Sequence, residues 1–112
     1  MIVKLQVFDL FGAFCVDAAL ATQVRSERVD IFLDAADQII FDFEGVRNMN
    51  SSFCNALIAN LLARYPECLS RIKFANCRSN LKVLIQSAVD LGLERVQNQA
   101  TNTSQGVASV GS

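Results

Sequence analysis

The sequence has no histidine, no tryptophan and a single proline, Pro66, among its 112 residues. Without imidazole side chains, Ser-His and Cys-His catalysis, phosphohistidine relay and histidine-ligated metal sites are excluded. The five glycines stand apart, so the chain has neither Gly-x-Gly-x-x-Gly nor Gly-x-x-x-x-Gly-Lys, the loops that hold nucleotide phosphates. We therefore expect a protein that is not an enzyme and that uses no metal and no cofactor.

The chain also lacks a run of charge of one sign and a long hydrophobic run. Its net charge is −1 with no basic cluster, whereas proteins that bind nucleic acid or membrane surfaces carry a basic patch. No stretch approaches the roughly 20 apolar residues that cross a bilayer. The first residues, with Lys4 among them, lack the pattern of a signal peptide. We expect a cytoplasmic protein that binds neither nucleic acid nor membrane.

Four cysteines are present, Cys15, Cys54, Cys68 and Cys77, but no pair has the Cys-x-x-Cys spacing of metal and redox sites. Disulfides are rare in chains without a secretion signal, and unpaired thiols pack as small hydrophobic groups. We therefore interpret all four cysteines as reduced structural residues.

Hydrophobic residues make up 52% of the chain, which is ample for one core. Residues 2–8 alternate between apolar and more polar positions, which predicts a strand near the edge of a sheet. Residues 38–43 form an almost continuous apolar run, typical of a strand that helices cover on at least part of both faces. Shorter strands are predicted at residues 71–75 and, more weakly, at residues 94–96.

Three helices are predicted between and after these strands. The first covers residues 16–35 with Ile31 on its buried face, the second covers residues 51–65, and the third runs from about residue 80 to Gly92. This order predicts an α/β sandwich with about four mostly parallel strands and right-handed crossovers. The residues expected in its core are Phe41, Phe43, Phe53, Leu57, Phe74, Leu84 and Ala88.

Residues 98–112 contain almost only small and polar side chains. Such a segment cannot bury enough apolar surface to offset the entropy lost on ordering. We predict a disordered polar tail there, which leaves residues 1–97 as the domain.

Parallel strands bring their carboxyl ends to one edge of a sheet, where open α/β sheets usually bind ligands and partners. Polar residues follow the predicted strands at this edge, and we interpret them as a partner-binding edge: Asp42, Glu44, Arg47, Asn50, Asn76, Arg78 and Ser79. Among them, Asp42 is expected to bond N–H groups of the loop, while Glu44 stays solvated.

Two serines, Ser51 and Ser52, stand where the second predicted helix begins. A helix start presents unpaired N–H groups and the positive end of the helix dipole. A hydroxyl there either caps the helix, which contributes about 1 kcal/mol, or accepts a phosphate of about −1.5 to −2 charge that the helix start stabilises. Both interpretations stay open at this point.

Four segments carry a resemblance to a known family. They are Ile-Ile-Phe-Asp-Phe-Glu-Gly-Val at residues 39–46, Asn-Ser-Ser-Phe at residues 50–53, Ile-Lys-Phe-Ala-Asn-Cys at residues 72–77 and the helix at residues 80–92. Through them the chain resembles, over about residues 2–96, the STAS-like family of unknown function. That family is similar to the STAS domains of anti-sigma-factor antagonists, so the resemblance implies a STAS-like sandwich.

In those antagonists an Asp-Ser-Ser/Thr-Gly turn opens the corresponding helix, and a partner anti-sigma kinase phosphorylates its hydroxyl. The match places this hydroxyl at Ser52, with Ser51 beside it. Two positions depart from the motif, because Asn50 replaces the aspartate and Phe53 replaces the glycine.

Two functions of different class follow. The resemblance implies a non-catalytic regulatory module that binds a protein partner, a GHKL-type ATPase acting as an anti-sigma kinase. Phosphorylation of Ser52 or Ser51 would switch this binding. The alternative is a small enzyme or a ligand-sensing domain that uses Asp42, Ser52 and Cys77 on the same edge. The absence of histidine and of glycine-rich loops favours the first function.

Overall fold

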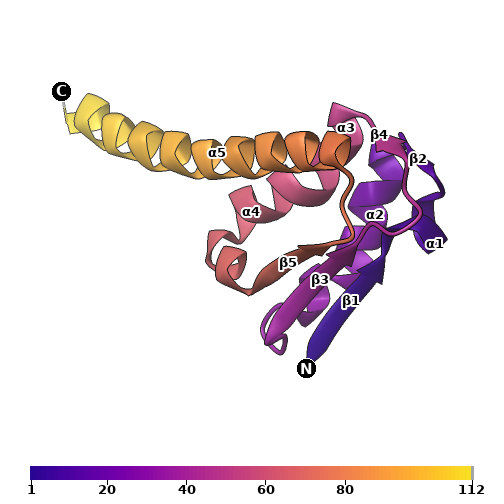
Figure 1. Cartoon of the computed structure of the whole chain (residues 1–112). Helices are drawn as coiled ribbons and strands as arrows, with labels where there is room; N and C mark the ends of the chain where they lie inside the picture. The colour runs from indigo at the N-terminus through magenta and orange to yellow at the C-terminus, as the bar shows by residue number, and fades with distance from the viewer. Residues whose placement is uncertain (112) are drawn as a thin grey trace.

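The three main strands predicted from the sequence form one parallel sheet in the computed structural model, which describes the backbone of residues 1–111 and the side chains of residues 1–97. The strands are β1 (Ile2–Gln6), β3 (Gln38–Asp42) and β5 (Ile72–Ala75), in the spatial order β1-β3-β5 (Figure 1). Both pairings are parallel. The α/β fold class, the parallel arrangement and the position of β1 at a sheet edge are confirmed.

A second, smaller ladder lies inside segments that the sequence does not assign to strands. In it β2 (Phe14–Cys15) pairs in parallel with β4 (Asn48–Met49). Strands of two residues are too short to produce a period-2 pattern, which explains why the sequence does not reveal them. Together the two ladders contain five strands, and the central sheet has three instead of about four.

Helices and helical turns connect the strands and cover the sheet. They are α1 (Val7–Phe11), α2 (Ala18–Arg28), the 3-10 helix η1 (Asp30–Phe32), α3 (Ser51–Cys54), the π-helical turn η2 (Asn55–Ala59), α4 (Asn60–Arg64), the 3-10 helix η3 (Pro66–Arg71) and α5 (Ser79–Gly111). The segments α3, η2 and α4 follow one another without a break, so they form the single helix predicted at residues 51–65. None of the helices in the described part combines the length and the apolar character needed to cross a membrane.

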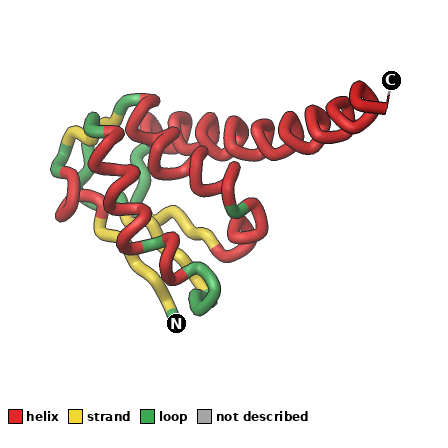
Figure 2. Tube along the Cα trace, turned by 180° about the vertical axis from the view of Figure 1, so that it is seen from behind, coloured by secondary structure: helices red, strands yellow, loops and turns green. Residues whose placement is uncertain are grey.

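The helices lie mainly on one face of the central sheet, as Figure 2 shows from the side opposite to Figure 1. On that face Ile39 and Phe41 of β3 are buried, whereas Ile40, which points to the other face, is only half-buried. The sequence predicts helices over at least part of both faces of β3, whereas the structure buries one face and leaves the other half-buried. A continuous apolar run does not by itself distinguish a half-covered strand from a fully covered one.

The first long helix is shorter than the predicted residues 16–35. It ends at Arg28, and the 3-10 turn that follows has fewer residues per turn, which changes the face that points inward. Val29 and Leu33, the residues on either side of this turn, are buried, while Ile31 inside it is 67% exposed. The prediction that Ile31 belongs to the buried face is wrong.

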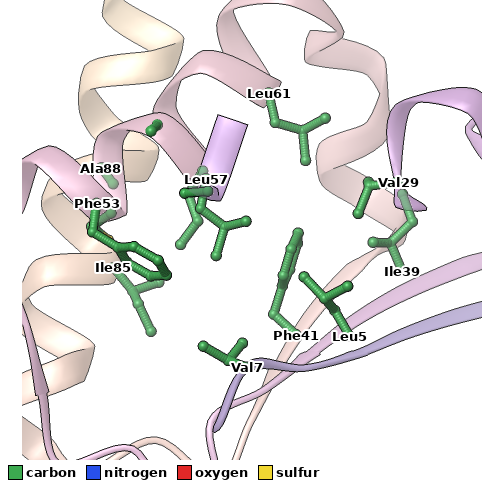
Figure 3. Close-up of a cluster of buried hydrophobic side chains, with 14 of the residues drawn as sticks. Leu5, Val7, Val29, Ile39, Phe41, Phe53, Leu57, Leu61, Ile85 and Ala88 are labelled. Atoms are coloured by element: carbon green, nitrogen blue, oxygen red, sulfur yellow. The ribbon is translucent and has the colours of Figure 1, made fainter. Parts of the chain in front are cut away.

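The core lies between the covered face of the sheet and the helices (Figure 3). Of the predicted core residues, five are buried: Phe41, Phe43, Phe53, Leu57 and Ala88. The other two, Phe74 and Leu84, are partly buried and pack against the core. Phe74 stacks on Phe41 with 5.8 Å between the ring centroids, but it lies on β5, an edge strand that in the described sheet pairs with β3 alone.

One arginine, Arg25 of α2, lies inside this core. Its Nη1 donates a hydrogen bond to the carbonyl oxygen of Ala56 at 2.9 Å, within the π-helical turn. Its Nε lies 3.3 Å from Oδ1 of Asp30. Neither Nε of Arg25 nor Oδ1 of Asp30 has a hydrogen-bond partner among the described residues. Their contact is therefore an ion pair whose geometry does not form a hydrogen bond. The arginine thus joins α2, the 3-10 turn and the second helix.

The sequence predicts that the third helix ends at Gly92 and that residues 94–96 form a strand. Both predictions are wrong, because α5 runs from Ser79 to Gly111. A Cβ atom built on Gly92 would lie 2.7 Å from the carbonyl oxygen of Ala59 and 2.9 Å from Cβ of Leu62. The glycine therefore permits close approach of two helices. The helix continues over residues 98–111, where the sequence predicts a disordered tail. The side chains of residues 98–112 lie outside the described part, and the boundary at residue 97 stays a prediction.

Replacing Gly92 with alanine is expected to lower the free energy of unfolding by about 1–3 kcal/mol, because the added methyl overpacks the contact with the backbone of Ala59. Helix propensity alone predicts the opposite sign, a gain of about 1 kcal/mol. Urea unfolding measures the difference. The exposed Ser87 on the same helix offers a control, since Ser87→Ala should be neutral or slightly stabilising. A stabilised Gly92→Ala variant would contradict the close packing of α5.

Candidate functional site

The edge where β3 and β5 end is organised around the carboxylate of Asp42. Asp42 is the last residue of β3 and is buried. Its Oδ1 accepts hydrogen bonds from Nδ2 of Asn76 at 2.9 Å and from the backbone N–H of Glu44 at 3.0 Å. Asn76 follows β5 with a φ of 56°, a left-handed conformation that asparagine tolerates better than most residues. The carboxylate therefore ties the loops after β3 and β5 together.

These contacts also set the charge of Asp42. The hydrogen bonds from Asn76 and from the Glu44 backbone lower its pKa below the usual range, and the nearby Lys4 ammonium, at 3.5 Å, acts in the same direction. Asp42 is thus an ionised anchor of the edge and a weak base. Glu44 is exposed. The expectation that Asp42 bonds loop N–H groups while Glu44 stays solvated is confirmed.

A second link holds the loop between β3 and α3. Nδ2 of Asn80, near the start of α5, donates a hydrogen bond to the carbonyl oxygen of Arg47 at 2.9 Å. On the other side, the backbone N–H groups of Arg47 and Asn48 donate to the carbonyl oxygen of Ala13. The sequence places Asn80 near the start of the third predicted helix but does not predict its contact with Arg47, because a contact between residues 33 positions apart leaves no local pattern. The side chains of Arg47, Arg78 and Ser79 are exposed at this edge.

The cap of the second helix is Asn50, and not Ser51 or Ser52. Oδ1 of Asn50 accepts a hydrogen bond from the backbone N–H of Phe53 at 2.8 Å, and Asn50 has extended backbone angles. Ser51 and Ser52 are the first two helical residues, and both are exposed. In the described structure neither hydroxyl takes part in a hydrogen bond. The sequence interpretation of a serine cap is wrong, because a capping side chain reaches forward two or three residues from the position before the helix.

Asn50→Ala is expected to lower the free energy of unfolding by about 1 kcal/mol, since the Phe53 N–H loses its acceptor. Ser51→Ala and Ser52→Ala remove hydroxyls that cap nothing and should change stability by less than about 0.5 kcal/mol. Thermal or urea unfolding of the three variants, measured side by side, checks the assignment. If Ser51→Ala or Ser52→Ala is less stable than Asn50→Ala, the capping residue is a serine and not Asn50.

Beside the serine pair lies a small apolar surface that sequence reasoning missed. Phe14 is 64% and Val16 61% exposed, and with Met49 and Asn50 they border a shallow hollow of about 150 Å³. The main chain of Asn50 donates to the carbonyl oxygen of Cys15 at 3.1 Å, which fixes the helix start against β2. The sequence does not reveal this surface, because Ala13 to Val16 is a short apolar run without a strand period and Val16 is assigned to the first predicted helix.

The four thiols are free and none is activated. Burial raises the pKa of Cys15 and Cys68 to about 11 and that of Cys54 to about 12. Cys77 is half-buried with its Sγ 3.6 Å from the carbonyl oxygen of Ala75, and burial raises its pKa as well. Thiols with raised pKa values form little thiolate at neutral pH, in agreement with the interpretation of structural cysteines.

The structure brings Asp42 together with Asn76, and Arg47 together with Asn80, but it does not link the three residues of the alternative enzyme. Across the described residues, no hydrogen bond or ion pair joins Ser52 to Asp42 or to Cys77. Among the same residues, no group of three or more His, Cys, Asp or Glu side chains is placed to hold a metal ion. What the edge offers is a fixed set of loops with exposed hydroxyls, two arginines and an apolar surface.

Comparison with known proteins assigns the chain to a family. A family model described as a STAS-like domain of unknown function matches residues 21–82, which include most of α2, the strand β3, the serine pair and β5. No curated protein and no solved structure matches the chain. Since the matched residues make up more than half of the sequence, the chain belongs to the STAS-like domain family of unknown function.

Proposed function

We propose that this protein is a non-catalytic regulatory module that binds a protein partner at the start of α3, and that phosphorylation of Ser52 switches the binding. The exposed serine hydroxyls carry this proposal, because Asn50 performs the capping and leaves them free for another role. A phosphate on a residue of the first helical turn would lie near unpaired N–H groups and the positive end of the dipole, which stabilise it. Ser51 is the second candidate for the same modification.

The neighbouring surface supports a protein partner. Phe14 and Val16 present exposed apolar area beside the helix start, and the edge loops add the exposed charges of Glu44, Arg47 and Arg78. Apolar side chains surrounded by polar and charged residues are typical of protein interfaces. By family resemblance, the partner is a GHKL-type ATPase that acts as an anti-sigma kinase.

The enzyme and ligand-sensing alternative receives less support from the same edge. Asp42 has its lowered pKa and its hydrogen bonds to Asn76 and the Glu44 backbone, and Cys77 has a raised pKa. A general base needs a pKa near the working pH, and a nucleophilic thiol needs a lowered one. Neither residue meets this requirement.

The test combines Ser52 variants with a purified GHKL-type ATPase. Ser52→Asp is expected to weaken the complex by about tenfold or more, because a carboxylate in an interface fitted to a neutral hydroxyl must lose its water. Ser52→Ala should bind about as well as the native protein but should no longer be released when ATP is added. Mass spectrometry of the native protein after ATP addition should find phosphate at Ser52 or Ser51.

Ser70→Asp is the matched control. Ser70 is exposed and lies just before the first residue of β5, at the other end of that strand from the partner-binding edge. It should leave binding unchanged. Equal affinity of the native, Ser52→Asp and Ser52→Ala proteins, together with no phosphate on either serine, would refute the switch.

A further inference from the structure

A groove separates β5 and η3 from α5, away from the serine pair. Its volume is about 710 Å³, within the roughly 300–1,000 Å³ of typical small-molecule sites. Leu69 of η3 and Phe74 of β5 form one side of the groove. In the described sheet β5 is an edge strand that pairs with β3 alone, so no further strand covers this side. The turn after β5 contributes Asn76 and Cys77 to the lining, and the first turns of α5 contribute residues between Lys82 and Val89.

The walls of this groove are apolar and held in place by the core. They consist of Leu69, Phe74, Ile85 and Val89. Ile85 is buried, while the other three are half-buried and so keep part of their apolar surface accessible. The ring of Phe74 is fixed by stacking on the buried Phe41. A wall supported in this way is formed before any ligand arrives, which lowers the entropic cost of binding.

The polar groups of the groove are few, and one of them is a cation. Lys82 is the one charged residue in the lining, which contains no carboxylate. The amides of Asn76 and Gln86 already donate to Asp42 and Asp90. The Lys82 ammonium makes no hydrogen bond or ion pair within the described part of the chain. It lies close enough to Cys77 for its positive charge to oppose the rise of the Cys77 pKa that burial causes, while the carboxylate of Asp42, outside the lining, acts in the opposite direction.

We infer that this groove binds a small amphipathic carboxylate, with an apolar body against Phe74, Leu69 and Val89 and the anionic group at Lys82. The apolar wall provides the area that such a molecule buries, and the unpaired ammonium provides the complementary charge. This site is distinct from the start of α3, and the inference does not rest on the proposed phosphorylation.

Cys77 provides a native reporter for the test, because it lines the groove and is half-buried, whereas the other three cysteines are buried. The probe is sodium decanoate, and decyltrimethylammonium, which has the same chain and a cationic head, is its control. The rate of alkylation by N-ethylmaleimide is followed by mass spectrometry. Decanoate is expected to slow the alkylation of Cys77 at least about fivefold at saturation, while the cation should have little effect. Alkylation of Cys15, Cys54 and Cys68 reports any unfolding.

Two lysine variants test whether protection by decanoate depends on the ammonium in the groove or on any loss of one positive charge. Lys82→Gln is expected to weaken the protection by decanoate about tenfold, since a charge-assisted hydrogen bond contributes about that much affinity. Lys73→Gln, an exposed position on β5 outside the lining, should leave it unchanged. Equal protection by the anionic and the cationic amphiphile, no protection by decanoate, or an unaffected Lys82→Gln variant would each overturn the inference.

Discussion

Replacing Arg25 with methionine is expected to lower the free energy of unfolding by about 3–5 kcal/mol, the usual result of removing one partner of a buried ion pair. The Arg25 side chain is 6% exposed and that of Asp30 is 12% exposed. Methionine fills similar space without the charge, so Asp30 loses its partner and the Ala56 carbonyl oxygen loses its donor. A charge and an acceptor left unpaired in a poorly hydrated position account for the loss.

Urea unfolding at neutral pH measures this change, and Arg28→Met serves as the control on the same helix because Arg28 is exposed. The control should stay within about 0.5 kcal/mol of the native protein. Adding Asp30→Leu to Arg25→Met should recover part of the stability, because the unpaired carboxylate is then gone. If Arg25→Met and Arg28→Met behave alike, the arginine does not hold the three segments together.

Replacing Phe41 with alanine is expected to cost about 3–5 kcal/mol, a large part of the roughly 5–15 kcal/mol that stabilises a domain. Phe41 is fully buried in the central strand β3, with Leu5 of β1 opposite it on one side and Phe74 of β5 on the other. Truncation removes buried apolar area and leaves a cavity between the three strands and the helices that cover them. Because the interior is closely packed, the neighbours cannot collapse fully into this space.

The control for this truncation is Phe14→Ala, which removes the same atoms from a residue that is 64% exposed. It should cost about 0.5 kcal/mol or less. Denaturant unfolding of both variants, with circular dichroism to verify that they fold, checks the difference. Similar losses for the two phenylalanines would mean that burial in this core does not determine their contribution.

Local patterns predicted the elements whose own residues carry the information. The alternation around Val3 and Leu5 identified β1 and its exposed side, because helices cover mainly one face of the sheet and alternate residues of a strand point to opposite faces. The apolar run through Phe41 identified the central strand. The second helix was predicted over residues 51–65, and it stops at Arg64, one residue earlier. Where such a pattern was ambiguous, the prediction failed. Gly92 is as compatible with close helix packing as with a helix end, and only the neighbouring helix separates the two.

The candidate site divides in the same way. That Asp42 would anchor the edge and that the helix would start near Ser51 were readable from the strand–loop–helix order. The choice of Asn50 over the serines as the cap depends on where the first helical turn begins, to within one residue. The exposed Phe14 and Val16 and the groove beside Lys82 have no local signal, since each combines segments that are distant along the chain.

The sequence by itself determined the class of this protein: its strand and helix periods, its lack of imidazole chemistry, and the serine pair at a helix start. The tertiary structure decided which of its polar groups are free and which are used. Arg25, Asp42 and Asn80 each have a partner more than 30 residues away, and such contacts leave no trace in local periodicity. Within residues 1–97, whose side chains are described, the Ser52 hydroxyl and the Lys82 ammonium have no such partner. This becomes visible only after the partners of the other polar groups are assigned, because a side chain is available for function when the fold does not already use it.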